Sequence, residues 1–526
     1  MGTDFSKDIT PPPLTLLDCL IDGELNLPRY YYYRTQLDNC LRSQRQEYCR
    51  RKRKRKLSLS DASVRNIKRQ ARTVKKYKVM ARDKNGMLRE VTPEDTLWYC
   101  LYVANPPASK RMHKLFRLRF RIPYSSFLNL SEDIIKHPLF DRWTRSDAAG
   151  SRPSNIKLLL LGSLRFLGRA WTLDDIYEAN GISINTNRDF IRCFIEYGST
   201  VLYKKYVIDQ VNVIDISERE KLFRQAGFNG CIGSTDATHV AMLRCAQWAQ
   251  NSHKGFKLST PARTYNVTVD HSLRILGSTL GHPGTWNDKT IILFDNLIFN
   301  VHDGKSFSDY EFKLFEKDSN GVINEVIYNG VWFMCDNGYL RWSCTVPPDT
   351  NAVTYDAIRF SEWLESMRKD IECFFGIMKG RFSILRYGFR YHTIEDCDKT
   401  WLTCCGLHNM LLEIDGLHKN WENGSRSNWE DSYYHLLLSE SHDNMTTPFA
   451  IERLHSHPLN DDNDACDDIR PNEITNMSEY CKKFMVNGKR MVSKMPLSVF
   501  RQCLINHFHI RFIRNDIIWP KRIKIT

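Results

Sequence analysis

An acid in the middle of an apolar run constrains this 526-residue chain more than any other feature. Residues 231–243 have the apolar character of a buried β-strand, and Asp236 stands among them in the stretch Ser-Thr-Asp-Ala-Thr-His. Burying an isolated carboxylate is costly, so Asp236 requires a metal, a base or a dense set of hydrogen bonds beside it. The fold must therefore bring partners for Asp236 from elsewhere in the chain.

Two later acids are candidates for those partners. Asp336 ends a second apolar run, and Glu372 borders the apolar stripe of a helical pattern over residues 362–382. Divalent cations prefer oxygen ligands, and a pair of them stabilises both the attacking and the leaving oxygen in phosphodiester chemistry. Three acids on two strands and a helix therefore predict a two-metal site.

Each of these acids also has a simpler interpretation. Taken alone, Glu372 would be an ordinary surface glutamate of an amphipathic helix. Only the presence of the other two acids in the sequence favours a functional role for it. Asp270 competes with Asp236 as the first acid, but it stands in a predicted turn, so we prefer Asp236. Asp370 lies two residues before Glu372 and is expected to point elsewhere on the helix.

The charge of the chain favours an anionic partner. The formal net charge is +14 and the pI is near 9.0, which is typical of proteins that bind nucleic acid. Residues 50–56 are all basic and cannot pack into a core. We expect this run to direct the protein to the nucleus and to contact the DNA backbone, the alternative being a solvated run; its central residues are Arg51, Lys52, Arg53, Lys54 and Arg55.

Residues 154–200 show three helical patterns separated by short breaks. This outline is that of a helix-turn-helix, although many helical bundles share it. If the unit reads DNA, the candidates for facing the groove are Asn185, Asn187, Arg188 and Arg192. A further basic amphipathic helix is predicted at residues 110–121, where a phosphate-binding helix and a scaffold helix are equally acceptable interpretations.

Beyond residue 229 strand patterns precede helical ones, which predicts a mixed α/β domain. The 16 cysteines contain no Cys-x-x-Cys pair, so a structural zinc site has little support. No apolar run reaches membrane-spanning length. We expect a basic arm over residues 1–90, an all-α helix-turn-helix-like domain over 91–215, a catalytic domain over 216–415 and an extension with an acidic loop over 416–526.

Five motifs in order resemble those of the PIF/Harbinger-type DDE transposases, over roughly residues 110–415. They are Ser-Thr-Asp-Ala-Thr-His-Val at 234–240, Gly-His-Pro-Gly-Thr-Trp-Asn-Asp-Lys at 281–289, Cys-Asp-Asn-Gly-Tyr at 335–339, Glu-Cys-Phe-Phe-Gly-Ile-Met-Lys-Gly-Arg-Phe at 372–382 and Leu-His-Asn-Met-Leu at 407–411. The second and third acids are separated by 372 − 336 = 36 residues, similar to the short spacing of that family.

The resemblance implies an RNase H-like catalytic fold, a mixed sheet with flanking helices, that cleaves and joins DNA strands with Mg²⁺ or Mn²⁺, as two ions. Its catalytic and metal-binding acids carry over to Asp236, Asp336 and Glu372. Asp288 and His239 would be supporting residues, and Lys379 and Arg381 would contact phosphate. The family pattern often has arginine directly after the third acid, where this chain has Cys373.

The resemblance also implies partners. They are double-stranded DNA, at the terminal repeats of the element and at its target, a Myb-like DNA-binding protein, and further copies of this chain in a homo-oligomer. Two rival functions stay open. One is a host-adopted protein that binds DNA or serves as a scaffold without cutting, and the other is a metal-dependent phosphoesterase of small substrates.

Overall fold

The computed structural model describes most of the chain from residue 92 onward. The described residues are 20–21, 24–25, 80–82, 87–90, 92–146, 153–211, 215–255, 257–416 and 477–519. One compact unit spans residues 1–91 and 463–466, and a second takes the rest. The first unit contains the antiparallel pairs β1 (Leu20–Ile21) with β2 (Glu24–Leu25) and β3 (Met80–Arg82) with β4 (Leu88–Glu90). The basic run at 50–56 lies outside the described residues.

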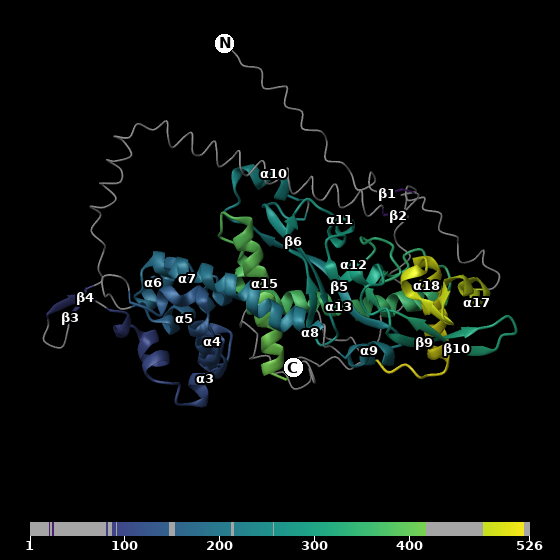
Figure 1. The fold of residues 1–526 in the computed structure, drawn as a ribbon, viewed down its shortest axis with the longest axis horizontal. Coiled ribbons are helices and arrows are strands. Elements are labelled where there is room, and N and C mark those ends of the chain that lie inside the picture. Colours follow the sequence, from purple (N-terminus) through teal and green to yellow (C-terminus); the bar gives the residue numbers. More distant parts are fainter. Residues whose placement is uncertain are drawn as a thin grey trace, which may run out of the picture. The chain divides into compact units, whose positions relative to one another are not determined.

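The second unit begins with helices (Figure 1). In chain order they are η2 (Pro93–Asp95), η3 (Tyr99–Ala104), α3 (Lys110–Phe120), α4 (Tyr124–Lys136), η4 (Pro138–Trp143), α5 (Ile156–Arg169), α6 (Leu173–Asn180), α7 (Ile184–Tyr197), η5 (Gly198–Leu202), η6 (Lys204–Ile208), α8 (Asp209–Val211) and α9 (Ile216–Gln225). The predicted helix at 110–121 is therefore α3, and its apolar face, with Phe116 and Phe120, is buried. Arg117 on its basic face pairs with Asp415 at 2.6 Å, which favours the scaffold interpretation for that residue.

Helices α5, α6 and α7 form the predicted three-helix group, and local chemistry sets their ends. Thr172 caps α6 in a capping box with Asp175, and Ser183 caps α7. Gly181 ends α6 with φ 68°, a conformation that glycine adopts at low cost. The three helices pack on one another, and a Cβ at Gly162 of α5 would lie 2.9 Å from the Ile176 side chain of α6.

Asn187 does not face outward as predicted for a groove-reading residue. It is 1% exposed, and its amide nitrogen donates to the Ile182 carbonyl at 2.7 Å while its oxygen accepts from Asn180 at 2.8 Å. The helical period places position 187 on the buried face of α7, while Asn185, Arg188 and Arg192 lie on its exposed or half-buried face. The two buried amides satisfy each other and lock α6 against α7.

We predict that Asn187→Ala lowers the free energy of unfolding by about 1–3 kcal/mol, because it leaves buried polar partners unsatisfied. The matched variant Asn185→Ala, at an exposed position of the same helix, should change it by less than about 0.5 kcal/mol. Denaturant melts of both variants measure the difference. Equal effects would mean that Asn187 is not part of the core.

A mixed sheet follows the helices. Its strands are β5 (Cys231–Ala241), β6 (Ala262–Val269), β7 (Ile275–Ser278), β8 (His282–Pro283), β11 (Trp332–Met334) and β12 (Thr345–Val346). The order is β12-β11-β5-β6-β7, and β8 also pairs with β6. Neighbours from β5 to β7 are antiparallel, while β11 and β12 run parallel to β5. The strand predicted around Asp236 is confirmed as β5.

Helices flank this sheet and connect its strands. They are α11 (Asp288–Ile292), α12 (Asn296–His302), α13 (Tyr355–Arg381), α14 (Ser383–Tyr387) and α15 (Ile394–Ile414), with η7 (Gln247–Ala249) and α10 (Gln250–His253) between β5 and β6. Residues 288–299 have the apolar pattern of a single helix, but they belong to two, because the Asp295 carboxylate accepts from the Leu297 and Ile298 amides and caps the start of α12. The long α13 packs on β5 and β6 (Figure 1).

A second, four-stranded sheet has the order β13-β14-β10-β9. It joins the hairpin of β9 (Glu311–Lys317) and β10 (Ile323–Asn329) to the C-terminal strands β13 (Met485–Val486) and β14 (Lys489–Met491). Also from this part of the chain come α17 (Met477–Tyr480), η12 (Cys481–Phe484), η13 (Val492–Lys494) and α18 (Leu497–Ile513). Residues 322–335 have the pattern of one strand in the sequence, but they divide between β10 and β11.

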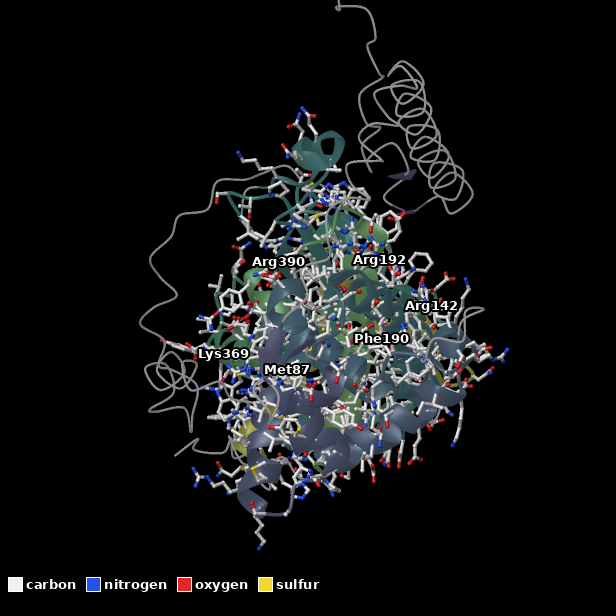
Figure 2. The ribbon with its side chains drawn as sticks, turned by 90° about the vertical axis from the view of Figure 1, so that its left-hand side faces the viewer. Met87, Arg142, Phe190, Arg192, Lys369 and Arg390 are labelled. Carbon is white, nitrogen blue, oxygen red and sulfur yellow. The ribbon has the colours of Figure 1, made fainter. Side chains whose placement is uncertain are left out.

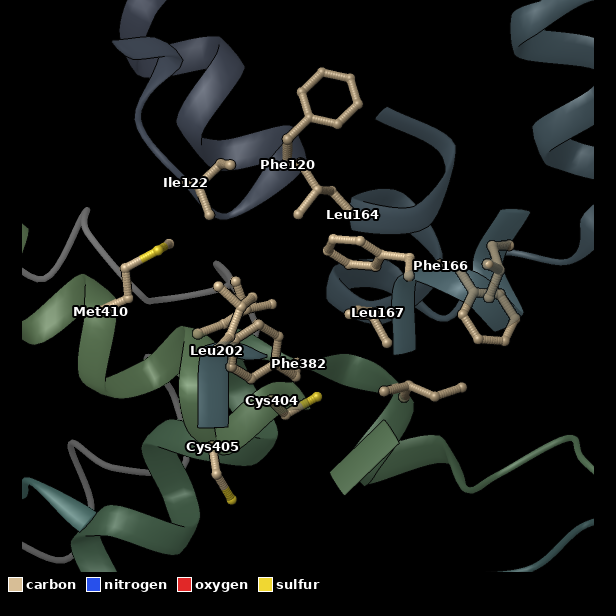
Figure 3. Close-up of a cluster of buried hydrophobic side chains, with 14 of the residues drawn as sticks. Phe120, Ile122, Leu164, Phe166, Leu167, Leu202, Phe382, Cys404, Cys405 and Met410 are labelled. Atoms are coloured by element: carbon tan, nitrogen blue, oxygen red, sulfur yellow. The ribbon is translucent and has the colours of Figure 1, made fainter. Parts of the chain in front are cut away.

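One large core connects the helical part to the mixed sheet. Figure 3 shows side chains from α3 and α5 meeting those from the end of α13 and from α15, among them Phe120, Leu164, Leu167, Phe382 and Cys404. All five are 2% exposed or less. Within the described ranges no helix is long and apolar enough to cross a membrane.

Candidate active site

The register of two parallel strands places the first two acids side by side. Met334, the last residue of β11, pairs with Ser234 of β5, and Asp336 and Asp236 each follow two residues later, close enough for the charge of Asp336 to raise the pKa of Asp236. Adjacent strands are about 4.8 Å apart, and residues two apart share a face. Asp236 is 20% exposed, and its Oδ1 accepts from the Ala237 amide at 2.7 Å.

Another acid, Asp288, is the first residue of α11, and its carboxylate lies near that of Asp336. A Cβ built on Gly338 would lie 3.0 Å from Asp336 Oδ1 and 3.2 Å from Asp288 Oδ2. Tyr339 is buried near these acids. Burial raises the pKa of its hydroxyl, and the charges of Asp236, Asp288 and Asp336 raise it further. A small residue at 338 is therefore needed where these carboxylates meet.

The environment makes the carboxyl groups of Asp236 and Asp288 weaker acids than usual. Burial raises the pKa of Asp236 to about 6, Asp336 and Asp288 add to the rise, and the Ala237 amide and Arg368 oppose it. Burial also raises the pKa of Asp288, with Asp336 adding and Lys257, whose Nζ lies 3.9 Å from Asp288 Oδ2, opposing. Like charges brought this close favour either proton uptake or a cation.

Arg368 links Asp236 to the third predicted acid, Glu372. Its Nη1 lies 3.4 Å from Asp236 Oδ2, and its Nη2 lies 3.1 Å from Glu372 Oε1 and 2.7 Å from Glu365 Oε1. Arg368 is 8% exposed, and Glu372 is half exposed. The structure thus places Asp236 near Asp336 and joins Glu372 to Asp236 through Arg368. Arg368 was not predicted from the sequence. Its spacing of four residues from Glu372 could have indicated an ion pair on one face of the helix.

Arg368 already supplies a positive charge between two of the acids. Among the described residues, no three His, Cys, Asp or Glu side chains are arranged so that they could hold a metal ion as they stand. The donor chemistry nevertheless suits a hard cation, since every acid at the site offers carboxylate oxygen. A metal bound by Asp236 and Glu372 would replace the guanidinium that they now share.

A basic rim, defined here as Lys257, Lys379 and His239, borders the acids. His239 Nδ1 lies 2.6 Å from Thr264 Oγ1, and its Nε2 is buried without a hydrogen-bond partner. Burial lowers the pKa of His239 to about 4, and the two lysines lower it further, so this imidazole is neutral at pH 7. Burial also lowers the pKa of Lys379. Lys257 was not singled out from the sequence.

Arg381 is not placed for the phosphate contact that the resemblance implied. It is fully buried, and its Nη1 lies 3.0 Å from His408 Nδ1. Burial lowers its pKa to about 9. A DNA backbone at the surface cannot reach this guanidinium, because the end of α13 turns into the core there.

Several motif residues hold the scaffold in place. Asn409 Oδ1 accepts from the Ile275 amide at 3.0 Å, and its Nδ2 donates to the Ile275 carbonyl, which fixes β7 against α15. Arg263 and Asp398 form a buried pair at 2.6 Å beside Gly281, at the start of the loop that leads to Asp288. Asp270 pairs with Arg219 at 2.8 Å and Asp370 with His271 at 2.5 Å, so neither joins the acid site.

We predict that Asp236 makes the stability of the metal-free protein depend on pH. Its folded pKa of about 6 lies above the unfolded value, so the folded state holds the proton more tightly and stability falls as pH rises from about 4 to 6. In Asp236→Asn this loss of stability does not occur, so above pH 6 the variant should be more stable than the wild type by about 2 kcal/mol. This figure is smaller than the full pKa difference would give, because the Asp236 side chain is partly exposed to solvent. Urea melts in EDTA at several pH values measure the gap, which should close toward pH 4. A gap independent of pH would contradict the assignment.

Comparison with known proteins bears on the central part of the chain. Residues 205–419 match the sequence model of a family described as plant transposon protein. No curated protein and no solved structure matches the chain. The matched range contains Asp236, Asp288, Asp336 and Glu372 together with Arg368. This match supports a transposon-derived origin for the part of the chain that carries the acid site.

Proposed function

We propose that this protein is a divalent-metal-dependent DNA nuclease of the PIF/Harbinger DDE type, which cuts and joins strands at transposon ends. The observation that carries the proposal is the meeting of Asp236 and Asp336 on neighbouring parallel strands, with Glu372 joined to Asp236 through Arg368. The match to plant transposon proteins supports the same class of activity.

The topology of the mixed sheet supports an RNase H-like catalytic fold. Three antiparallel strands come first, and two further strands then add in parallel on the other side of the first strand. The first acid lies on that central strand, the second follows the first parallel strand, and the third lies on the helix after the last strand. This is the arrangement expected of DDE enzymes.

Asp236, Asp336 and Glu372 would hold Mg²⁺ or Mn²⁺, with Asp288 beside them. The cations would stabilise the attacking and leaving oxygens of an in-line phosphodiester exchange. The residues of the chain itself have separate tasks. Arg368 would keep its contact with Glu365 and give up the other two acids, while Lys257 and Lys379 would hold the phosphates of the strand to be cut.

We predict that Asp236→Asn, Asp336→Asn and Glu372→Gln each lower DNA nicking by about a thousandfold, because each removes a charge from the group that stabilises the reacting oxygens. The measurement is nicking of supercoiled DNA that carries the element ends, with Mg²⁺ or Mn²⁺. Asp370→Asn is the matched control, since this acid is on the same helix but contacts His271. It should keep most of the activity. Full activity of the Asp236 variant would refute the site.

DNA recognition would rest on the helix-turn-helix group, with α7 as the reading helix. The side chain of Arg192 is 55% exposed (Figure 2). Arg192 lies seven residues after Asn185 and four after Arg188, which are both exposed. These positions recur on one side of the helix. The basic run with Arg51 to Arg55 would add sequence-independent contacts and a nuclear address. A Myb-like partner and a homo-oligomer belong to the same proposal.

Arg188→Ala combined with Arg192→Ala should weaken binding to duplex DNA. Because two positive charges that displace counterions from the duplex are lost, the slope of log affinity against log salt concentration should become shallower by about 2. Lys482→Ala combined with Lys483→Ala makes the same change of charge on exposed residues of the C-terminal part and should leave the slope unchanged. Fluorescence anisotropy across salt concentrations compares them. Equal slopes in both double variants would exclude α7 as the reading helix.

The alternative is a host-adopted protein that binds DNA or serves as a scaffold without cutting. The position of Arg368 favours it, because the guanidinium neutralises Asp236 and Glu372 without any metal. The nicking assay separates the two functions. Binding of element-end DNA without nicking, with both metals tested, would favour the adopted function, and metal-dependent nicking would favour the nuclease.

A further inference from the structure

Two cysteines from the C-terminal part of the chain are in contact. Cys481 is the first residue of η12, and Cys503 lies near the middle of α18. Their Sγ atoms are 3.7 Å apart, the distance of a hydrogen bond between two thiols, and neither residue has exposed surface. Because the two positions are 22 residues apart, a bond between these sulfurs would close a loop that contains β13, β14 and η13.

Cys481 lies on a short turn at the surface. The residues that follow it in η12, Lys482 and Lys483, are exposed, and so are Met485 and Val486 of β13. On its inner side Cys481 belongs to the core that joins α18 to α13. Local opening of such a turn costs far less free energy than unfolding of the core, so a small solute can reach Cys481 in the folded protein.

The surroundings favour a negative charge on Cys481 rather than on Cys503. The hydrogen bond from Cys503 lowers the pKa of Cys481, and the buried Arg490 lowers it further, against the opposing effects of burial and of Glu316. The same hydrogen bond and burial raise the pKa of Cys503. Arg490 is held by Glu316 and by Tyr328, whose hydroxyl lies 2.7 Å from its Nη1. A thiolate beside a guanidinium is the reactive form of cysteine, so Cys481 is the nucleophile of the pair.

We propose that Cys481 and Cys503 form a redox-active dithiol, whose disulfide ties the segment with β13 and β14 to α18. The oxidant is a hydroperoxide such as hydrogen peroxide. The Cys481 thiolate attacks one peroxide oxygen, the O–O bond breaks, and Cys481 becomes a sulfenic acid while the released hydroxide takes up a proton to form water. The Cys503 sulfur then attacks the Cys481 sulfur, so that the S–S bond forms and the S–O bond breaks. The departing hydroxide takes the Cys503 proton and forms a second water, and in total the two thiols lose two electrons and two protons to the peroxide.

The disulfide would act on the fold through the C-terminal helix. α18 packs on α13, the helix that carries Arg368 and Glu372, and Cys503 shares a core with Met367. The disulfide would restrict the unfolded chain over residues 481–503 and so favour the folded C-terminal part. This redox role is separate from the proposed nuclease function, because neither step involves the acids, a metal or DNA.

The test begins with the fully reduced chain, which is treated with hydrogen peroxide, alkylated with N-ethylmaleimide under denaturing conditions and digested for mass spectrometry. We expect a linked pair of peptides that contains Cys481 and Cys503 and that dithiothreitol separates. The peroxide-treated protein should also have a Tm about 3 °C or more above that of the reduced protein. Cys481→Ser should abolish both effects, whereas Cys193→Ser, at a half-buried cysteine of α7, should keep them.

A second variant tests the order of the two steps. In Cys503→Ser the sulfenic acid of Cys481 has no partner, so dimedone should label Cys481, while Cys503 in Cys481→Ser should stay unlabelled. If either variant does not fold, the peptide map of the wild type still decides the question. Alkylation of both Cys481 and Cys503 as free thiols after peroxide treatment, or a linked pair without any rise in Tm, would overturn the proposal. Labelling of Cys503 in place of Cys481 would contradict the assigned nucleophile.

Discussion

The charge of Asp236 inside a packed sheet is the constraint on which the rest of the site depends. Burial raises the pKa of this carboxyl group, and two neighbouring acids raise it further. Arg368 of α13 opposes this rise in pKa, because its guanidinium contacts Asp236 as well as Glu372 and Glu365. The position of α13 against the sheet and the charge state of the acids are therefore linked, because the same guanidinium serves both.

The other residues named at the site either lie near the acids or hold the elements that carry them. Asp288, Lys257 and Lys379 border the acids and offer charge to a substrate. Arg263, paired with Asp398, holds the start of the loop that leads to Asp288, and the Leu-His-Asn-Met-Leu stretch fixes β7 through backbone hydrogen bonds. A motif can thus mark a functional region of the chain even when its own residues act only by positioning other elements.

Local patterns predicted many of the elements, and their failures have physical causes. The strand around Asp236 and helices α5, α6 and α7 were predictable, because apolar period, caps and Gly181 all act over short range. Asn187 was predicted to face the DNA groove, and the resemblance implied that Arg381 contacts phosphate, but both side chains are buried. The helical period puts Asn187 inside, and the turn after α13 buries Arg381. A buried polar side chain is recognised only when its partner is known.

The sequence by itself determined which residues could carry the chemistry: an acid within an apolar strand, an acid at the end of another, and an acid on an amphipathic helix. Only the tertiary structure decided that these residues meet. The parallel pairing of β11 with β5 sets Asp336 beside Asp236, and the packing of α13 on that sheet brings Arg368 between Asp236 and Glu372. Strand register and helix packing join segments a hundred residues or more apart, and no local pattern encodes such a contact.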